Sequence, residues 1–239
     1  MHCSNLRILP VLLAAACVAT LAAQSGNAAA RRDRDAFNLP ALETLAARAA
    51  QQATSAKTGA AYLHSAQLYA WASEAALGRQ DKPAIVQLTK AGMNAAQAAV
   101  KLEPRSAAAH AFLGSFMGQM IPYVPNGGMI YGERATQELA TALRIDPHSV
   151  QALTAQGLAL LYTPAAFGGG PAAALKDLQK AAALGPRDDT PHLWLAQVYE
   201  QQKNWSGAKR EIATALKLDP HRQFSRYVAA RIAKESAGR

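Results

Sequence analysis

Cysteine is almost missing from this sequence, and its scarcity excludes two kinds of chemistry. Only Cys3 and Cys17 occur among the 239 residues, and both lie near the N-terminus. Removal of that region would leave a chain with neither a disulfide framework nor a reactive thiol. The fold must then be stabilised by packing alone, in one domain or in one continuous array.

The motifs that hold phosphates, metals or catalytic nucleophiles are also missing. Neither a G-x-x-x-x-G-K-S/T nor a G-x-G-x-x-G pattern occurs, and no histidine pair has the spacing of metal ligands. The turn Gly168–Gly170 could hold an anion, but Pro171 removes one donor from it, so we interpret it as a structural turn. Ser115 lacks the G-x-S-x-G elbow of a nucleophile. We therefore expect no cofactor, no metal and no enzymatic activity.

Aromatic residues make up only 6% of the chain, whereas its formal net charge is +9. This charge favours acidic partners or anionic surfaces. Because the aromatics are sparse and no dense basic run occurs, we expect no nucleic acid among the partners. The mixed charge run Arg31–Asp35 is typical of a solvated linker, to which we assign residues 31–39.

Residues 1–30 have the pattern of a secretory signal peptide. A basic start up to Arg7 precedes an apolar stretch, residues 8–23, and small residues follow as far as Ala30. We expect cleavage after Ala28 or Ala30, with Ala23 as an alternative. The protein would then be exported to the periplasm or cell envelope of a bacterium.

Two other fates of this leader are open. The apolar stretch could remain uncut as a membrane anchor, although it is short for a span of about 20 residues. Cys17 follows Leu-Ala-Ala-Ala, which loosely resembles a bacterial lipoprotein box, whose cysteine is acylated after cleavage. Only these two outcomes would bring the chain into contact with a membrane.

One short phrase occurs four times and organises the rest of the chain. It ends at Pro104, Pro147, Pro186 and Pro220, and its versions include Ala-Val-Lys-Leu-Glu-Pro and Ala-Leu-Lys-Leu-Asp-Pro. Each phrase is the end of an amphipathic helix, which proline terminates because it has no N–H for the next turn. The intervals between successive prolines are similar in length, which indicates helix pairs that must stack to bury their apolar faces.

The small and large residues of each unit, counted back from its closing proline, resemble the tetratricopeptide repeat, whose period of about 34 residues separates the last two prolines. In the last unit they are Leu195, Ala196, Tyr199, Ala208, Ile212 and Ala215. The two preceding units supply Leu113, Gly114, Ala135, Leu139 and Ala142, and then Gly157, Leu160, Ala174, Leu178 and Ala181. The resemblance covers residues 105–220 as three units and implies an all-α fold, a right-handed solenoid of stacked helix pairs.

The flanking segments are helical but less regular. Apolar spacing predicts helices over about 40–57, 59–78 and 83–102, which we group as irregular N-terminal helices in residues 40–104. Residues 221–239 carry one apolar stripe, so we expect them to form a C-terminal capping helix. Such a helix covers the last exposed face of a solenoid.

Two insertions interrupt the repeats, each between the two helices of a unit. Residues 121–131 and 163–171 both combine proline, an aromatic and a glycine cluster. Equivalent loops of stacked units should lie side by side, and loops on one face of a solenoid often bind partners. We select Tyr123, Tyr131 and Phe167 as anchors for a partner. The competing interpretation is that Tyr131 and Phe167 only plug the top of their own helix pair.

The first helices of stacked tetratricopeptide units line a concave groove, and the resemblance places a set of polar residues there. The candidate groove residues are Ser115, Gln119, Gln151, Thr154, Tyr162, Gln197, Glu200 and Gln201. The set is rich in amides and hydroxyls and nearly uncharged, which favours another protein or a peptide as the ligand. The alternative is that these side chains only solvate an exposed face.

A second resemblance concerns function. The segment from Phe167 to Pro186, together with the leader, resembles a bacterial envelope subfamily that includes the periplasmic tetratricopeptide components of tripartite ATP-independent transporters. We expect an exported binding module that acts as a protein–protein interaction scaffold in an envelope complex. The alternative is a small-molecule-binding accessory of a periplasmic transporter, with a pocket under the two insertions.

Overall fold

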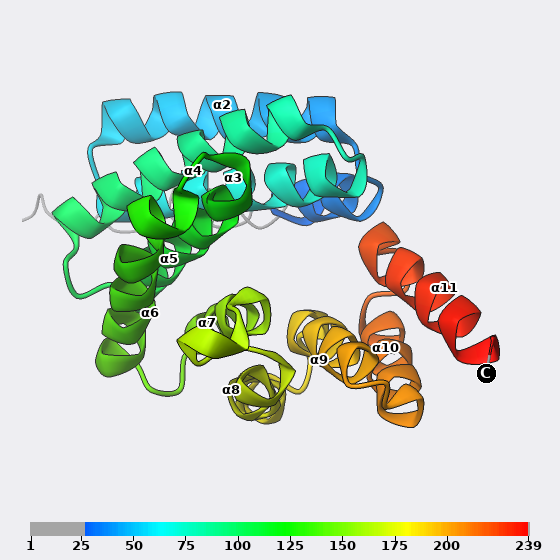
Figure 1. Ribbon diagram of the computed structural model, residues 1–239. Helices are drawn as coiled ribbons and strands as arrows, with labels where there is room; N and C mark the ends of the chain where they lie inside the picture. Colours follow the sequence, from blue (N-terminus) through cyan, green and yellow to red (C-terminus); the bar gives the residue numbers. More distant parts are fainter. Residues whose placement is uncertain (1–26, 239) are drawn as a thin grey trace, which may run out of the picture.

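The computed structural model describes residues 27–238, and within this range the chain folds into helices without a strand (Figure 1). Most of the expected signal peptide, including Cys3 and Cys17, lies outside the described residues. None of the described helices is both long and apolar enough to cross a membrane. The predicted all-α solenoid is confirmed.

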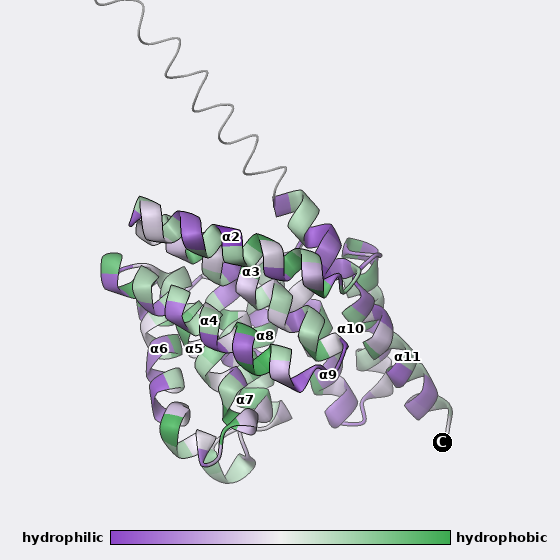
Figure 2. Cartoon of the chain, turned by 90° about the horizontal axis from the view of Figure 1, so that it is seen from above, coloured by the Kyte–Doolittle hydropathy of each residue, from purple (hydrophilic) through white to green (hydrophobic). Residues whose placement is uncertain are grey.

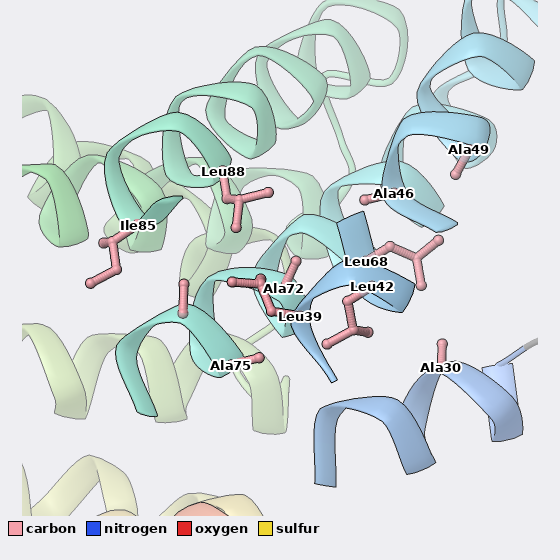
Figure 3. Close-up of a cluster of buried hydrophobic side chains, with 11 residues drawn as sticks. Ala30, Leu39, Leu42, Ala46, Ala49, Leu68, Ala72, Ala75, Ile85 and Leu88 are labelled. Atoms are coloured by element: carbon pink, nitrogen blue, oxygen red, sulfur yellow. The ribbon is translucent and has the colours of Figure 1, made fainter. Parts of the chain in front are cut away.

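The N-terminal third consists of a short helical segment, residues 27–35, and three long helices, α2 (Leu39–Ala56), α3 (Gly59–Gly78) and α4 (Lys82–Leu102). Each long helix begins and ends within one residue of its predicted limits. The helices share a cluster of buried leucine and alanine side chains (Figure 3). Ala30, from the short segment, belongs to the same cluster and is 1% exposed.

Three helix pairs follow, α5 (Ala107–Met120) with α6 (Glu133–Ile145), α7 (Val150–Tyr162) with α8 (Pro171–Leu184), and α9 (Asp189–Gln201) with α10 (Trp205–Leu218). The first insertion contains the turns η1 (Ile121–Tyr123) and η2 (Gly128–Gly132), the second contains η3 (Ala165–Phe167), and α11 (Gln223–Ala237) follows the last pair. The N-terminal helix α3 contacts α5, and the first helices of the three pairs contact one another in series, α5 with α7 and α7 with α9. This series is the stacking expected of a solenoid.

A polar side chain two residues after each closing proline starts the next unit. Ser106, Ser149 and Asp188 each accept a hydrogen bond from a backbone amide in the first turn of the helix that follows. The equivalent residue after Pro220 is Arg222, whose side chain does not cap α11. The last helix therefore lacks the side-chain cap that starts the other units, because Arg222 directs its side chain to other contacts.

The small positions of the repeat lie where paired helices touch. The second-helix residues that the repeat pattern places in the core are at most 5% exposed: Ala135, Leu139, Ala142, Ala174, Leu178, Ala181, Ala208, Ile212 and Ala215. A Cβ atom added to Gly114 would lie 2.7 Å from Cγ of Leu139, and one added to Gly157 would lie 2.5 Å from Cγ of Leu178. Helices this close leave no room for a larger residue at either glycine.

The helix pairs follow a curve, with the first helices on its inner side and the second helices on its outer side (Figure 1). The curve brings the N-terminal segment and the start of α11 close to α9, and side chains from these parts bond one another. Seen from above, polar and apolar residues alternate along the helices (Figure 2). Helices such as α6 thus have one face in the core and another in solvent, whereas α5 has no exposed residue.

The assignment of residues 31–39 to a solvated linker is wrong. Residues 31–35 are helical, α2 already begins at Leu39, and Arg34 and Asp35 are only 4% and 7% exposed. Arg34 can be buried because the carboxylates of Asp35 and Asp219 both compensate its charge. Local sequence patterns do not predict this burial, because the partner of Arg34 is Asp219, 185 residues further along the chain.

Candidate interaction surface

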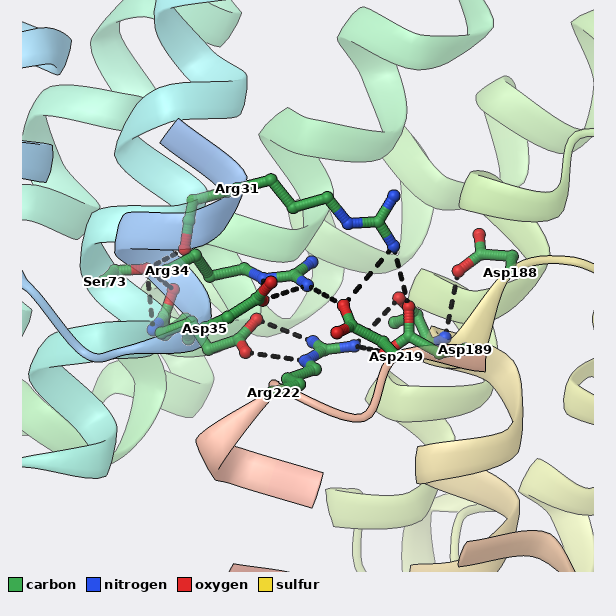
Figure 4. A network of polar contacts seen from close by, with 12 residues as sticks. Arg31, Arg34, Asp35, Ser73, Asp188, Asp189, Asp219 and Arg222 are labelled. Carbon is green, nitrogen blue, oxygen red and sulfur yellow. Dashed lines mark hydrogen bonds and ion pairs between the residues drawn. The ribbon is translucent and has the colours of Figure 1, made fainter. Parts of the chain in front are cut away.

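A set of charges, most of them buried, joins the two ends of the array (Figure 4). We call it the closing network, and its members are Arg31, Arg34, Asp35, Glu74, Asp189, Asp219 and Arg222. Arg34 donates to Asp35 and, through Nη2, to Oδ2 of Asp219 at 2.7 Å. Arg31 lies 3.2 Å from Asp189 and 3.5 Å from Asp219. Burial raises the pKa of the Asp35 carboxyl, although Arg34 opposes this shift.

Arg222 is the centre of the closing network. Its Nε and Nη2 donate to the two carboxylate oxygens of Glu74 at 2.9 and 2.7 Å, and its Nη1 donates to Asp189 at 2.6 Å. Burial alone would lower the pKa of Arg222, but Glu74 and Asp189 outweigh burial and hold the pKa above its ordinary value. The paired hydrogen bonds to Glu74 also fix the orientation of α3 relative to the start of α11.

The groove candidates on α5 bond within the fold but remain partly accessible. Ser115 is half-buried and donates to the carbonyl of Ala111 at 2.8 Å, as serines inside helices often do. Gln119 is half-buried and shares a 3.3 Å hydrogen bond with Ser73 of α3. The polar surface therefore continues onto α3, which our sequence reasoning did not include.

The three candidates on α7 differ in exposure. Gln151 is half-buried, whereas Thr154 is 8% exposed and donates to the carbonyl of Val150 at 2.7 Å. Tyr162, at the end of the helix, is 62% exposed. Burial of part of this side chain raises the pKa of the Tyr162 phenol, Arg231 of α11 lowers it, and Glu200 of α9 raises it. Tyr162 therefore lies close to charges on two neighbouring helices, while Thr154 belongs to the interior.

On α9 the capping helix covers two of the three candidates. Gln197 and Glu200 are 5% and 9% exposed, and only Gln201 is open to solvent. Arg231 donates to the two carboxylate oxygens of Glu200 at 2.7 and 2.6 Å, and more weakly to Gln197 Oε1 at 3.4 Å. The nearly uncharged groove predicted from the sequence thus contains an ion pair at this end. Arg231 and its neighbour Tyr227 were missed because α11 was treated only as a cap.

The first insertion packs partly against the N-terminal helices. Tyr123 is half-buried beside the cluster shared by α2, α3 and α4, and Tyr131 is half-buried beside a second cluster around Phe116. The most exposed apolar side chains of this insertion are Met129 and Ile130, at 87% and 55%. We did not select those two residues from the sequence, although they directly follow the glycine cluster.

The second insertion holds Phe167 in solvent. This side chain is 81% exposed, so it does not plug its helix pair as the competing interpretation required. The loop beneath it is tight, because Gly168 and Gly170 have φ angles of +79° and +103° and the Gly170 amide donates to the carbonyl of Leu160 at 2.8 Å. A Cβ atom at Gly169 would lie 2.1 Å from the carbonyl oxygen of Thr163. Contact between the two insertions stays a prediction.

Histidines at one repeat position form equivalent pairs in two units. His110 Nδ1 lies 2.6 Å from Glu138 Oε2, and His192 Nδ1 lies 2.9 Å from Glu211 Oε2. Each pair links the first helix of a unit to the second. The part of the chain that the structure describes contains no group of three or more side chains that could hold a metal ion.

The middle unit lacks this pair. Leu153 stands at the histidine position, and Asp177 stands where the other two units have glutamate. Burial raises the pKa of the Asp177 carboxyl, and Lys176 and Lys180 only partly offset that effect. Asp177 is therefore a half-buried acid without the histidine partner found in the neighbouring units.

Comparison with known proteins gives a family and a fold. Residues 169–231 match the model of the tetratricopeptide repeat family. A thermophilic TPR protein from Thermus thermophilus has 18% sequence identity and a TM-score of 0.62, over 87% of this chain and 98% of the other. No curated protein matches the chain.

Two further solved structures are less similar. The pilF protein of Pseudomonas aeruginosa has 20% identity over 72% of this chain and 69% of its own, with a TM-score of 0.48. MamA of Desulfovibrio magneticus RS-1, from residue 41 to its end, has 17% identity over 72% of this chain and 92% of its own, with a TM-score of 0.41.

Proteins with tetratricopeptide repeats are generally non-catalytic scaffolds that bind other proteins or peptides along an extended concave surface. The helix pairs, the buried small positions and the serial contacts of the first helices all have that architecture here. Residues 169–231 therefore match the tetratricopeptide repeat family, and the chain as a whole has the fold of a TPR protein.

Proposed function

We propose that this chain is an exported scaffold in a bacterial envelope complex, and that it binds its partner along the inner side of the curve. One observation carries the proposal. Gln119, Tyr162 and Gln201 occupy the same repeat position, counted from the preceding closing proline, on three successive first helices, and each is at least partly accessible. A partner segment that lies along this row would contact three units at once, which suits an extended protein chain.

Two exposed aromatic residues, one in the row and one in the loop that follows it, support the same proposal. Tyr162 and Phe167 are 62% and 81% exposed and lie at the end of α7 and in the loop that follows it. Large aromatic side chains contribute much of the binding energy in protein interfaces. Tyr162 adds a hydroxyl group that can bond to a partner.

The alternative, a solute-binding accessory of a transporter, requires a closed cavity lined by apolar side chains. The two hollows that stand out on the surface both open widely to solvent. One lies along α2 at Arg48 and Gln52, and the other lies between α4 and Tyr123. Open hollows of this kind favour the scaffold over the solute receptor.

The pattern of the leader supports export. The burial of Ala30 in addition argues against one of the three candidate cleavage positions. Ala30 is 1% exposed in the N-terminal cluster, and the next residue, Arg31, bonds to Asp189. Cleavage after Ala30 would remove a core residue and place a charged amine beside the closing network. Of the three candidate positions, we therefore propose cleavage after Ala23 or Ala28.

The binding surface can be tested by blocking it. The experiment captures partners from an envelope fraction with the full chain. It then compares capture by the Ser115→Trp variant with capture by the Ala213→Trp variant. Ala213 is exposed on the outer helix α10. A bulky ring at Ser115 should weaken capture about tenfold or more. The Ala213 variant should capture normally, and both variants should melt close to the parent. Equal capture by the two folded variants would contradict the proposal.

Export can be tested separately. The intact mass of protein recovered from the envelope of an expressing bacterium should correspond to a chain that begins at residue 24 or 29. A mass that retains Met1, or a diacylglyceryl group on Cys17, would contradict this cleavage and favour the anchor or the lipoprotein.

A further inference from the structure

The two sides of the curve differ in charge. The inner helices α3, α5, α7 and α9 contain no lysine or arginine, and their only charged residues are Glu74, Asp189 and Glu200. The outer helices are α4, α6, α8 and α10, of which α4 packs against α3 and α5 as α6 packs against α5 and α7. These four helices carry ten lysine and arginine residues and four acids, a net charge of +6 out of +9 for the whole chain. The positive charge is therefore concentrated on the outer side.

The basic residues of the outer helices face solvent, whereas most of the acids do not. All ten lysines and arginines are exposed, and among the acids only Glu133 is exposed. Glu138 and Glu211 are half-buried and bond the histidines of the inner helices at 2.6 and 2.9 Å, although an arginine of the same helix also contacts each of them. Asp177 is half-buried as well. We call this surface of the four helices the outer basic face.

The helix α4 is the most basic part of this face, because it contains three lysines and no acid. Lys82 is exposed at the start of the helix. Further exposed residues follow helical spacing and form one stripe, which consists of Pro83, Gln87, Lys90, Asn94, Gln97 and Lys101. None of the three lysines forms an ion pair in the part of the chain that the structure describes. Their charges are therefore available to an external anion.

The outer basic face lacks the apolar centre of a protein interface. Within these four helices the only large apolar side chains that are exposed are Leu102 and Leu184, at the ends of α4 and α8. Trp205, the single aromatic residue of the four helices, is half-buried. A stable interface between proteins normally has apolar and aromatic side chains at its centre. The face therefore does not suit an acidic protein as its main partner.

The spread of the charges favours an extended array of anions over a single small one. Because the cations are distributed over four successive helices, one phosphate or carboxylate could contact only a few of them. The headgroups of an anionic bilayer are numerous, and each basic residue near such a surface adds to the attraction. A bilayer surface can thus meet many of these cations at once.

We propose that the outer basic face binds the surface of a bilayer rich in anionic phospholipid, such as phosphatidylglycerol, through electrostatic attraction to the headgroups. This contact needs neither an uncut leader nor a lipid on Cys17, the two routes to a membrane that the sequence suggested. It goes beyond the proposed function, because it leaves the inner side of the curve free for the partner protein. Since the face exposes few apolar side chains, the chain rests on the headgroups without entering the hydrocarbon.

The test measures binding to vesicles by the chain that begins at Ala29. This chain keeps Ala30 and every helix from α2 to α11, but it lacks the apolar stretch of the leader, which would itself bind lipid. Vesicles of phosphatidylcholine with about 30% phosphatidylglycerol should co-sediment the protein in about 0.1 M salt, and about 0.5 M salt should release it. Vesicles of phosphatidylcholine alone should not bind the protein.

Two triple variants that remove the same charge locate the site. The first variant combines Lys82→Gln, Lys90→Gln and Lys101→Gln. The control combines Arg32→Gln, Arg226→Gln and Lys234→Gln, all at exposed positions outside the outer helices. The first variant should bind the anionic vesicles about tenfold more weakly or worse, and the control should lose less than about threefold. Both should melt close to the parent, because none of the six side chains is buried.

Three results would overturn the inference. The first is an equal loss of binding in the two triple variants, which would show that total charge attracts the lipid. The second is binding that persists in high salt or on phosphatidylcholine alone, which would indicate apolar insertion. The third is no binding to the anionic vesicles, including the case in which duplex DNA is bound instead. Ser115→Trp should bind the vesicles normally, so loss of membrane contact and loss of partner capture are separate outcomes.

Discussion

Nη2 of Arg34 lies 2.7 Å from Oδ2 of Asp219, although 185 positions separate these two residues along the chain. In a repeat array most contacts join neighbouring units, so the end units are the first to fray. Here the N-terminal segment and the residue that ends α10 hold each other through side chains that are 5% and 8% exposed. We therefore expect the two ends to unfold together.

Arg222→Met should be strongly destabilising. The substitution leaves the carboxylates of Glu74 and Asp189 without their buried counter-ion, which costs about 3–5 kcal/mol. Urea unfolding followed by circular dichroism measures this change. The control is Arg226→Met, one turn further along α11, where the arginine is exposed and bonds only the carbonyl of Pro220. Similar stabilities for the two variants would show that the closing network contributes little.

Removal of the N-terminal segment should destabilise the whole array. A chain that begins at Ala29 keeps Ala30 and Arg34, whereas a chain that begins at Asn38 loses both. The second chain should be less stable by about 3 kcal/mol, since Asp219 is left as a buried charge without Arg34. For a domain of this size that corresponds to a melting temperature roughly 6–12 °C lower. Identical melting curves would mean that residues 29–37 are dispensable for the fold.

Two glycines of α5 should respond to alanine in opposite directions. Gly114→Ala places a Cβ 2.7 Å from Cγ of Leu139 and 2.9 Å from the carbonyl oxygen of Ala135, and should cost about 1–3 kcal/mol. Gly118→Ala meets no atom within 4 Å and should stabilise the helix by about 0.5–1 kcal/mol. Differential scanning calorimetry distinguishes the two outcomes. A stabilising Gly114→Ala would disprove the close approach of α5 and α6.

Asp177→Asn should stabilise the protein at neutral pH but not in acid. Because burial raises the folded-state pKa of Asp177, the native state binds this proton more tightly than the unfolded state does, and ionisation at neutral pH opposes folding. The variant should melt higher than the parent at pH 7. The difference should vanish as the pH falls below about 3.9, the ordinary pKa of aspartate in an unfolded chain.

The control for this experiment is Glu138→Gln, at the equivalent position of the preceding unit. Glu138 bonds His110 at 2.6 Å, so its neutralisation should lower the melting temperature at pH 7. An Asp177→Asn effect of the same size at pH 7 and pH 3 would show that ionisation is not its cause.

Local sequence patterns predicted the helices and their core positions. The closing prolines defined the repeat register, and the small residues Ala135, Ala174 and Ala208 are all buried where that register places them. The repeat register and the buried positions could be predicted because each depends only on residues within one unit. Helical spacing determines the buried positions, and the missing N–H of proline determines where each unit ends.

The closing network could not be predicted in the same way, because its members come from segments far apart in the sequence. The run Arg31–Asp35 has the composition of a solvated linker, and only the curvature of the array brings it to Asp219. One signal was available at Arg222. It occupies the position where Ser106, Ser149 and Asp188 cap a helix, and arginine cannot accept a backbone hydrogen bond.

The burial of the groove candidates on α9 was missed for a related reason. Gln197 and Glu200 were placed in the groove from the repeat register, which describes a unit followed by another unit. Here the next element is a single helix, and its Arg231 reaches back over α9. Because such a contact depends on how a cap packs, the spacing within the repeats did not predict it.

The bond between the two ends also restricts how a protein of this shape can change its length. Tetratricopeptide arrays are ordinarily tolerant of duplication or loss of a unit, since each unit contacts only its neighbours. In this chain an added helix pair would carry Asp219 and Arg222 away from Arg34 and Glu74, and would break both of these buried ion pairs. Adding a repeat would therefore cost these two ion pairs, whereas longer loops within units, such as the two insertions, leave both pairs in place.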